Sequence, residues 1–212
     1  MQDDLHEPGE LYLYGPEPGP GSRVLLLLHG RGSTAESILL LGDEIAPKGT
    51  SLVAPQAVNS TWYPHSFMRD FALNEPWLSS ALARVNRIVE DLLGRGVKSE
   101  DLALAGFSQG ACLTLEYTMR YPRRYLAAIG LSGGLIGPPG TQWTAPGSLD
   151  GTPVFIGCSD IDDHIPVERI HESAEAMAAA GAAVDKRVYP GMGHTVNDDE
   201  LKACRALLAH SP

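Results

Sequence analysis

One serine of this sequence lies where an apolar, strand-like run passes into a helix-like stretch. Residues 106–110 read Gly-Phe-Ser-Gln-Gly, the run before them covers 102–105, and a helical pattern begins near residue 111. Glycines on both sides permit a tight, strained strand-to-helix turn, which lifts a serine hydroxyl off the edge of a sheet. The same turn points the backbone N–H of Gln109 toward the hydroxyl. We therefore predict that Ser108 is a nucleophile rather than an ordinary residue of a glycine-rich turn.

A serine hydroxyl is a weak nucleophile near pH 7 unless a base takes its proton. Among the seven histidines, His194 lies in the sequence Gly-Met-Gly-His, after the last expected strand and before the last expected helix. Open α/β sheets place their chemistry in loops at the carboxyl ends of their strands. We predict that His194 is the base, whereas His29 is expected to be a buried structural histidine.

A carboxylate is expected to orient the base, and it should come from a loop after an earlier strand. Residues 157–164 form such a segment and contain Asp160, Asp162 and Asp163, among which spacing alone does not choose. The order serine, aspartate, histidine is that of α/β-hydrolases and differs from the chymotrypsin-like and subtilisin-like orders. Asp162 to His164 also resembles the start of a metal site. No third and fourth ligand follows at fixed spacing, so we predict no metal.

A second backbone donor is expected after the first central strand. Residues 28–32 read Leu-His-Gly-Arg-Gly, and the two glycines leave the N–H of Arg31 free to turn toward the nucleophile. With the N–H of Gln109, it would form an oxyanion hole for a tetrahedral intermediate. The alternative interpretation is a glycine-rich turn that leads into a capped helix.

Apolar runs alternate with helical patterns along the whole chain. Expected strands cover 11–14, 24–28, 52–54, 102–105, 126–131, 154–156 and 184–188, and expected helices cover 33–45, 74–94, 111–121, 166–180 and about 201–208. This alternation predicts an α/β fold with a mainly parallel sheet and right-handed crossovers, in one domain over residues 1–212. We interpret 15–21 as a hairpin loop between the first two strands, and Ser33 to Glu36 as a capping box.

The composition narrows the classes of partner. A net charge of −10 disfavours nucleic acid and anionic membranes as partners, and no apolar stretch is long enough to span a membrane. The acidic N-terminus lacks a basic segment followed by an apolar core, so no secretory signal is predicted. Three cysteines are an odd number without metal-type spacing. They are typical of reduced thiols, and we expect a cytoplasmic protein.

Five short motifs resemble one known family. They are 29–32, 106–110, the Leu-Ser-Gly of 131–133, the Asp-x-x-x-Pro of 162–166 and the Gly-His of 193–194. In this order they resemble the phospholipase/carboxylesterase family of small α/β-hydrolases, which includes bacterial carboxylesterases and acyl-protein thioesterases. The resemblance extends from about Val24 to Leu208. The family's Asp-Pro-x-Val-Pro pattern falls on 162–166 and selects Asp162. Because Asp163 replaces the proline, Asp160 is kept in reserve.

The resemblance implies an α/β-hydrolase fold with about seven strands, helices on both faces and no separate lid domain. It also implies a mechanism in which Ser108 attacks an ester carbonyl and forms an acyl-enzyme, His194 transfers the proton and Asp162 orients His194. Arg31 and Gln109 would donate their N–H groups to the oxyanion. Neither a metal nor an organic cofactor is expected. Similar proteins are commonly dimers, so a homodimer is a further expectation, although no interface can be named.

The segment 56–71 and the residues after 133 are expected to form the pocket walls. The apolar side chains expected there are Trp62, Tyr63, Phe67, Met68, Phe71, Leu135 and Ile136. Such a pocket suits small carboxylic esters of short to medium acyl chain, and the Arg31 side chain could meet an anionic group. The aromatics could instead form a satellite core. A thioesterase or lysophospholipase is the alternative within the same chemistry, and a catalytically silent hydrolase fold used as a binding module is the alternative of another class.

Overall fold

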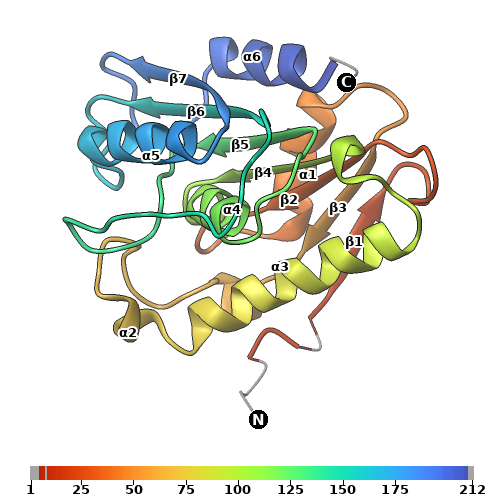
Figure 1. The fold of residues 1–212 in the computed structure, drawn as a ribbon, viewed down its shortest axis with the longest axis horizontal. Coiled ribbons are helices and arrows are strands. Elements are labelled where there is room, and N and C mark those ends of the chain that lie inside the picture. The colour runs from red at the N-terminus through yellow and green to blue at the C-terminus, as the bar shows by residue number, and fades with distance from the viewer. Residues whose placement is uncertain (1–4, 8, 210–212) are drawn as a thin grey trace.

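Seven strands of the computed structural model, which describes residues 5–7 and 9–209, form one twisted sheet (Figure 1). They are β1 (Leu11–Tyr14), β2 (Val24–Leu28), β3 (Ser51–Pro55), β4 (Leu102–Phe107), β5 (Ala127–Leu131), β6 (Pro153–Ser159) and β7 (Ala183–Tyr189). The order across the sheet is β1-β3-β2-β4-β5-β6-β7, with β1 antiparallel to β3 and the other pairs parallel. The mainly parallel sheet of the prediction is therefore confirmed.

Helices cover both faces of this sheet. They are α1 (Ala35–Ile45), α2 (Phe71–Asn74), α3 (Trp77–Gly94), α4 (Gln109–Arg120), α5 (Val167–Ala179) and α6 (Asp198–Ala209), with 3-10 turns at Val58–Ser60 and Ser99–Asp101. The fully buried β2 alternates between two cores: Leu25 and Leu27 pack with α1 and α6, whereas Leu26 and Leu28 pack with α3, α4 and α5. This is why the strand reads as a continuous apolar run.

Two local predictions were wrong. Residues 15–21 do not form a hairpin loop, because β1 pairs with β3 and the chain passes beside Thr50 before it enters β2 on the far side of β3. The short sequence spacing between β1 and β2 gave no sign that β3, which comes later in the chain, lies between them in the sheet. The capping box of α1 lies one residue further along than expected, since the Thr34 hydroxyl accepts from the N–H of Ser37.

The turn between β4 and α4 depends on two glycines. A Cβ at Gly110 would overlap the carbonyl of Leu28, and a Cβ at Gly106 would overlap the backbone of Gly110. The absence of side chains therefore lets the start of α4 press directly against the end of β2. Ser108, between them, has a φ of 57° and a ψ of −120°, a backbone conformation that non-glycine residues rarely adopt. Strain of this kind persists only where the surroundings enforce it.

Replacing Gly110 with alanine should destabilise the fold by at least about 3 kcal/mol, because the new methyl group meets backbone rather than a side chain that can move. The matched control is Gly94→Ala, where a Cβ meets open space at the end of α3 and should stabilise the protein by up to about 1 kcal/mol. Urea unfolding of both variants measures the difference. Equal stability of the two variants would contradict the close approach of α4 to β2.

Candidate active site

The hydroxyl of Ser108 lies beside the ring of His194. The distance between Ser108 Oγ and His194 Nε2 is 2.8 Å. The Ser108 N–H donates to the carbonyl of Leu131 on the neighbouring strand, at 2.9 Å, which fixes the turn against the sheet. Phe107 packs against the imidazole with ring centroids 5.0 Å apart. The serine and the histidine, which are 86 residues apart in the chain, are therefore held at hydrogen-bonding distance.

The other nitrogen of His194 meets a carboxylate. His194 Nδ1 lies 2.7 Å from Asp162 Oδ2, and the second oxygen, Oδ1, accepts from the N–H groups of His164 and Ile165 at 2.8 and 3.1 Å. An ionised carboxylate can only accept, so Nδ1 carries the proton and Nε2 is left to accept from the serine. The Asp162 side chain is fully buried. Burial opposes ionisation, but the hydrogen bonds from His194 and from these two N–H groups hold the pKa of Asp162 below its usual value.

The structure distinguishes the three aspartates of the loop after β6. Asp162 contacts His194, whereas Asp160 Oδ1 accepts from the N–H of Gly191 at 2.8 Å. Asp160 thus holds the first part of the loop that carries the histidine. Asp163, which replaces the family's proline, is exposed. The loop keeps the Asp162 contact despite this replacement because backbone N–H groups, rather than a proline ring, fix the carboxylate.

The two residues with predicted oxyanion-hole N–H groups border the serine. Gln109 is the first residue of α4, a position whose N–H has no acceptor within the helix. Gly30 packs against the turn, since a Cβ there would lie 3.5 Å from Ser108 Cβ, and Arg31 follows it. Both Arg31 and Gln109 line the same cavity as the serine. The amino end of α4 also directs its positive dipole into this space.

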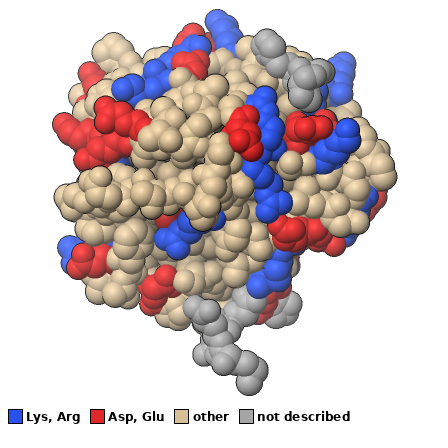
Figure 2. Space-filling model, in the orientation of Figure 1, with Lys and Arg blue, Asp and Glu red and all other residues tan. Residues whose placement is uncertain are grey.

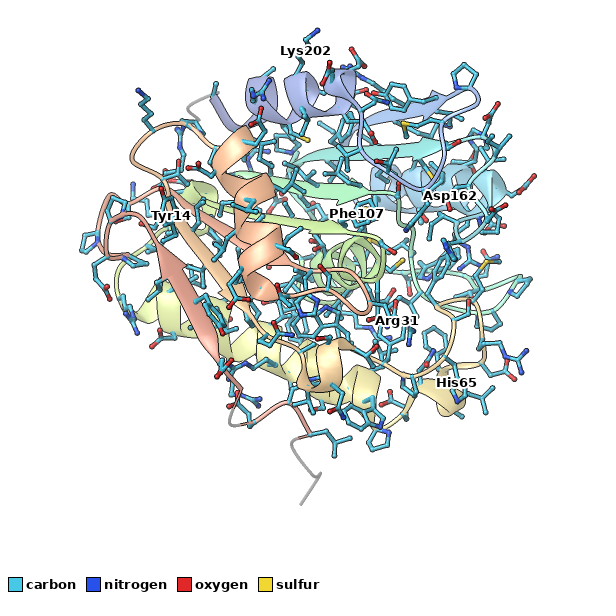
Figure 3. All side chains as sticks on the ribbon, turned by 180° about the vertical axis from the view of Figure 1, so that it is seen from behind. Tyr14, Arg31, His65, Phe107, Asp162 and Lys202 are labelled. Atoms are coloured by element: carbon cyan, nitrogen blue, oxygen red, sulfur yellow. The ribbon has the colours of Figure 1, made fainter. Side chains whose placement is uncertain are left out.

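The side chains of the same two residues hold one wall of the cavity. Gln109 accepts from the N–H of Trp62 at 3.0 Å and donates to the carbonyl of Tyr63 at 2.8 Å. The guanidinium of Arg31 donates to the carbonyls of Pro64 and His65 at 2.9 and 2.8 Å. The irregular segment that follows β3 is therefore positioned by residues adjacent to the nucleophile. In Figure 3, Arg31, His65, Phe107 and Asp162 lie toward the same end of the sheet.

A cavity of about 630 Å³ opens over Ser108. Its lining consists of Gly30, Arg31, Ser33, Tyr63, Pro64, His65, Ser66, Phe67, Phe107, Ser108, Gln109, Cys112, His164, Ile165 and His194. Sequence reasoning did not identify His65, His164, Phe107 or Ile165 as lining residues. Two of them could have been predicted from their place in the sequence, since Phe107 precedes Ser108 and His164 lies two residues after Asp162.

Only part of the predicted pocket wall lines this cavity. Tyr63 and Phe67 do, whereas Trp62, Leu135 and Ile136 are fully buried in the core and absent from the lining. Met68 and Phe71 are partly buried and pack against the same core. The reason for Trp62 is a hydrogen bond, since its indole N–H donates to the carbonyl of His29 at 2.9 Å. Most of these side chains thus belong to a core, as the alternative interpretation held, but to the large core shared with the sheet rather than to a separate satellite.

His29 supports the turn before Arg31 rather than the chemistry. Its ring is fully buried, with Nδ1 2.8 Å from the carbonyl of Gly30 and Nε2 accepting from the N–H of Ala57 at 3.1 Å. Burial lowers the pKa of His29, so the ring is neutral near pH 7. Cys112, in contrast, reaches the cavity, although burial raises the pKa of its thiol to about 12 and leaves it protonated.

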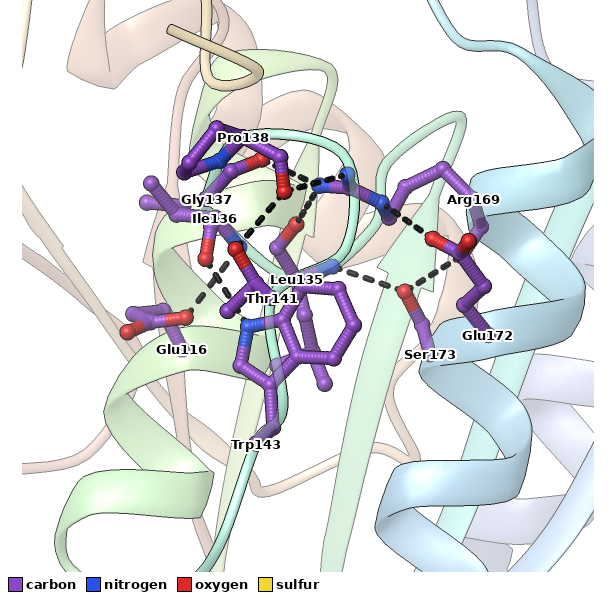
Figure 4. Close-up of polar contacts among 10 residues, drawn as sticks. All are labelled: Glu116, Leu135, Ile136, Gly137, Pro138, Thr141, Trp143, Arg169, Glu172 and Ser173. Atoms are coloured by element: carbon purple, nitrogen blue, oxygen red, sulfur yellow. Dashed lines mark hydrogen bonds and ion pairs between the residues drawn. The ribbon is translucent and has the colours of Figure 1, made fainter. Parts of the chain in front are cut away.

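A buried arginine fixes the loop after β5 (Figure 4). Arg169 of α5 donates to the carbonyls of Leu135 and Gly137, each at 2.8 Å, and its guanidinium lies 4.9 Å from the ring centroid of Trp143. The same guanidinium lies 5.7 Å from the ring centroid of Phe67, a residue of the cavity wall. Arg169 therefore joins the loop after β5, which does not itself line the cavity, to the segment that carries Phe67 in the cavity wall.

The fold and the arrangement at the end of β4 define an α/β-hydrolase. Within the described residues, the cavity is bordered by loops that follow the strands, by the end of β4 and by the start of α4, and none of these forms a separate lid domain. No helix in that part of the chain has the length and apolar character needed to cross a membrane. That part also contains no group of three or more His, Cys, Asp or Glu side chains arranged to hold a metal ion.

Comparison with known proteins identifies the family. The chain belongs to the phospholipase/carboxylesterase family, whose model matches residues 17–211, and is therefore a carboxylic ester hydrolase by class. It is similar to a phospholipase/carboxylesterase from Dyadobacter fermentans, with 39% identity, a TM-score of 0.91 and coverage of 95% of this chain and 97% of that one. It is also similar to the esterase PE8, with 27% identity, a TM-score of 0.74 and coverage of 94% of this chain and 97% of that one. Acyl-protein thioesterase 1 of Saccharomyces cerevisiae is 24% identical over 218 residues, which cover 91% of this chain and 94% of that protein.

Proposed function

We propose that this protein hydrolyses carboxylic esters of short to medium acyl chain, with Ser108 as nucleophile, His194 as general base and acid, and Asp162 as the orienting carboxylate. The observation that carries the proposal is the continuous line of hydrogen bonds from Ser108 through His194 to Asp162, at 2.8 and 2.7 Å, on the wall of a cavity. Nucleophile, base and orienting group at such distances are the geometric signature of an activated serine.

In the first half of the reaction, Ser108 Oγ attacks the ester carbonyl while His194 Nε2 takes its proton. The imidazolium that forms is stabilised by the buried Asp162 carboxylate, which remains ionised. The developing oxyanion accepts from the N–H groups of Arg31 and Gln109. Collapse of the tetrahedral intermediate breaks the bond to the alcohol, which takes the proton from His194 and leaves an acyl-enzyme on Ser108.

In the second half, a water molecule replaces the alcohol. His194 takes a proton from this water, and the oxygen attacks the acyl carbonyl, so that a second tetrahedral intermediate forms on the same donors. Its collapse returns the proton to Ser108 and releases the carboxylic acid. The protein groups named here account for every proton transferred.

The preference for short to medium chains rests on what closes the cavity. Tyr63 and Cys112 line it and are themselves buried, whereas Trp62 and Leu135 occupy the core instead of widening the space. Ester and thioester cleavage share this chemistry, and an acyl-thioesterase is the second candidate because a relative over most of the chain is named acyl-protein thioesterase 1. The hydrogen bonds of Ser108, His194 and Asp162 argue against a silent binding module.

Replacing Ser108 with alanine should reduce kcat/KM on p-nitrophenyl esters by at least about 10⁴-fold, because the nucleophile is lost while the cavity remains. The matched control is Ser33→Ala, which removes another hydroxyl from the lining and should retain activity within a few-fold. The measurement is hydrolysis of a series from acetate to palmitate, with circular dichroism to verify folding. Near-normal activity of the folded Ser108→Ala variant would refute the proposal, and a maximum on long chains would refute the preference.

Asp162→Asn should lower kcat/KM by about 10⁴-fold, since an amide can donate to Nδ1 and so favours the wrong tautomer of His194. Asp160→Asn, in the same loop, should cost less than about tenfold because Asp160 contacts only the backbone of Gly191 among the groups near the histidine. Steady-state kinetics on the best ester compares the two variants. A larger loss in Asp160→Asn than in Asp162→Asn would reverse the assignment.

A further inference from the structure

Among the described residues, the cavity over Ser108 is lined by an arginine and three histidines and by no carboxylate. These basic side chains are Arg31, His65, His164 and His194. The whole chain has 26 acidic and 16 basic residues and a net charge of −10. On the face drawn in Figure 2, basic side chains lie interspersed with acidic ones. The lining of the cavity therefore contains a guanidinium charge and no carboxylate in an otherwise acidic protein, and a positive charge in a cleft attracts anions.

The contacts of Arg31 leave its charge available. The guanidinium donates to the hydroxyl of Thr61 at 3.3 Å and to the carbonyls of Pro64 and His65, which are all neutral acceptors. These three contacts hold the side chain at the cavity without neutralising it. A guanidinium has five N–H donors, so two remain for a ligand. Arg31 is exposed, and a ligand can therefore reach these donors without displacing the wall.

Two further features add donors to the same space. His65 and His164 are exposed at the cavity, and the ring of His164 meets that of His194 edge-on, with centroids 4.7 Å apart. Imidazole rings donate hydrogen bonds and become cationic on protonation. The amino end of α4, a helix of 12 residues, points its dipole into the cavity from the side of Ser108. Arg31, His65 and His164 thus offer hydrogen-bond donors to an anion, while the buried Asp162 carboxylate lies behind His194, which it contacts at 2.7 Å.

We propose that the preferred substrates are esters that carry a second, anionic group, a carboxylate or phosphate, close to the scissile ester, and that the Arg31 guanidinium binds this group with the help of His65 and His164. This inference rests on the proposed ester hydrolysis by Ser108. Arg31 then has two roles, since its backbone N–H serves the oxyanion and its side chain serves specificity. A hydrogen bond to a charged group is stronger than one between neutral groups, which corresponds to a preference of about tenfold to hundredfold.

The test compares two pairs of esters, in each of which a methyl cap removes the negative charge from the neutral member. One pair is the 4-nitrophenyl monoester of adipic acid and its methyl-capped diester, with the anion on the acyl side. A second pair is the butanoate of 3-hydroxybenzoate and that of its methyl ester, with the anion on the alcohol side. We expect kcat/KM to favour the anionic member of at least one pair by about tenfold or more. The pair that shows the preference identifies the side on which Arg31 binds the anion.

For each variant, we compare the kcat/KM for the anionic ester with that for the neutral ester. A loss of activity that affects both esters equally does not change this ratio. Arg31→Gln should bring this ratio close to one, and Arg31→Lys should retain part of it because the charge stays while the planar fork is lost. The matched control is Arg69→Gln, an exposed arginine outside the lining, which should keep the wild-type ratio. In the wild type, raising the salt concentration from 0.05 to 0.5 M should shrink the ratio by screening.

Three outcomes would overturn the inference. A wild-type ratio at or below one for both pairs would do so while leaving ester hydrolysis intact. A ratio that stays at the wild-type value in Arg31→Gln would show that the Arg31 side chain does not bind the anionic group. Absence of hydrolysis of both neutral and anionic esters by the folded wild type would overturn the proposed function and this inference together, and is thereby distinguished from the first two results.

Discussion

The close approach of α4 to β2 is the constraint on which the rest of the site depends. Because Gly110 lacks a side chain, the first turn of α4 packs directly on the carbonyl of Leu28. Ser108, which joins β4 to α4, is thereby forced into a conformation with positive φ. This single turn sets the direction of the serine hydroxyl, the place of the Gln109 N–H and the axis of the helix dipole. Sterics between backbone atoms, rather than side-chain bonding, thus fix the reacting geometry.

The same turn also builds the cavity. Gln109 and Arg31 flank the serine through their backbones, while their side chains bind the segment that carries Tyr63 and His65. The residues next to the nucleophile therefore position this wall of the cavity, rather than a distant helix or strand. On the far side, Arg169 joins Phe67 to the loop after β5. An irregular loop of this length is usually variable in position, and here buried polar contacts replace regular secondary structure as its support.

The sequence predicted what local patterns encode. Apolar runs and glycines located the strands, the helices and the turn at Ser108, and loop positions after strands singled out His194. Pairing between strands distant in the chain was not encoded locally, so the neighbour of β1 was missed. The prediction of pocket residues was partly wrong for a related reason, because hydrophobicity does not distinguish a side chain that lines a pocket from one in the core. Trp62 lies in the core, where its indole N–H donates to the carbonyl of His29. The choice of Asp162 needed the family pattern, because spacing left three aspartates equal.

Labelling with a fluorophosphonate, followed by peptide mass spectrometry, tests whether His194 activates Ser108. Such reagents react with a serine whose proton is taken by a neighbouring base and spare ordinary hydroxyls. We expect one adduct per chain, on Ser108 in the peptide that contains residues 106–110, and the loss of this adduct in the folded His194→Ala variant. An unlabelled wild type, an adduct on another serine, or labelling that persists without His194 would contradict the activation of Ser108 by His194.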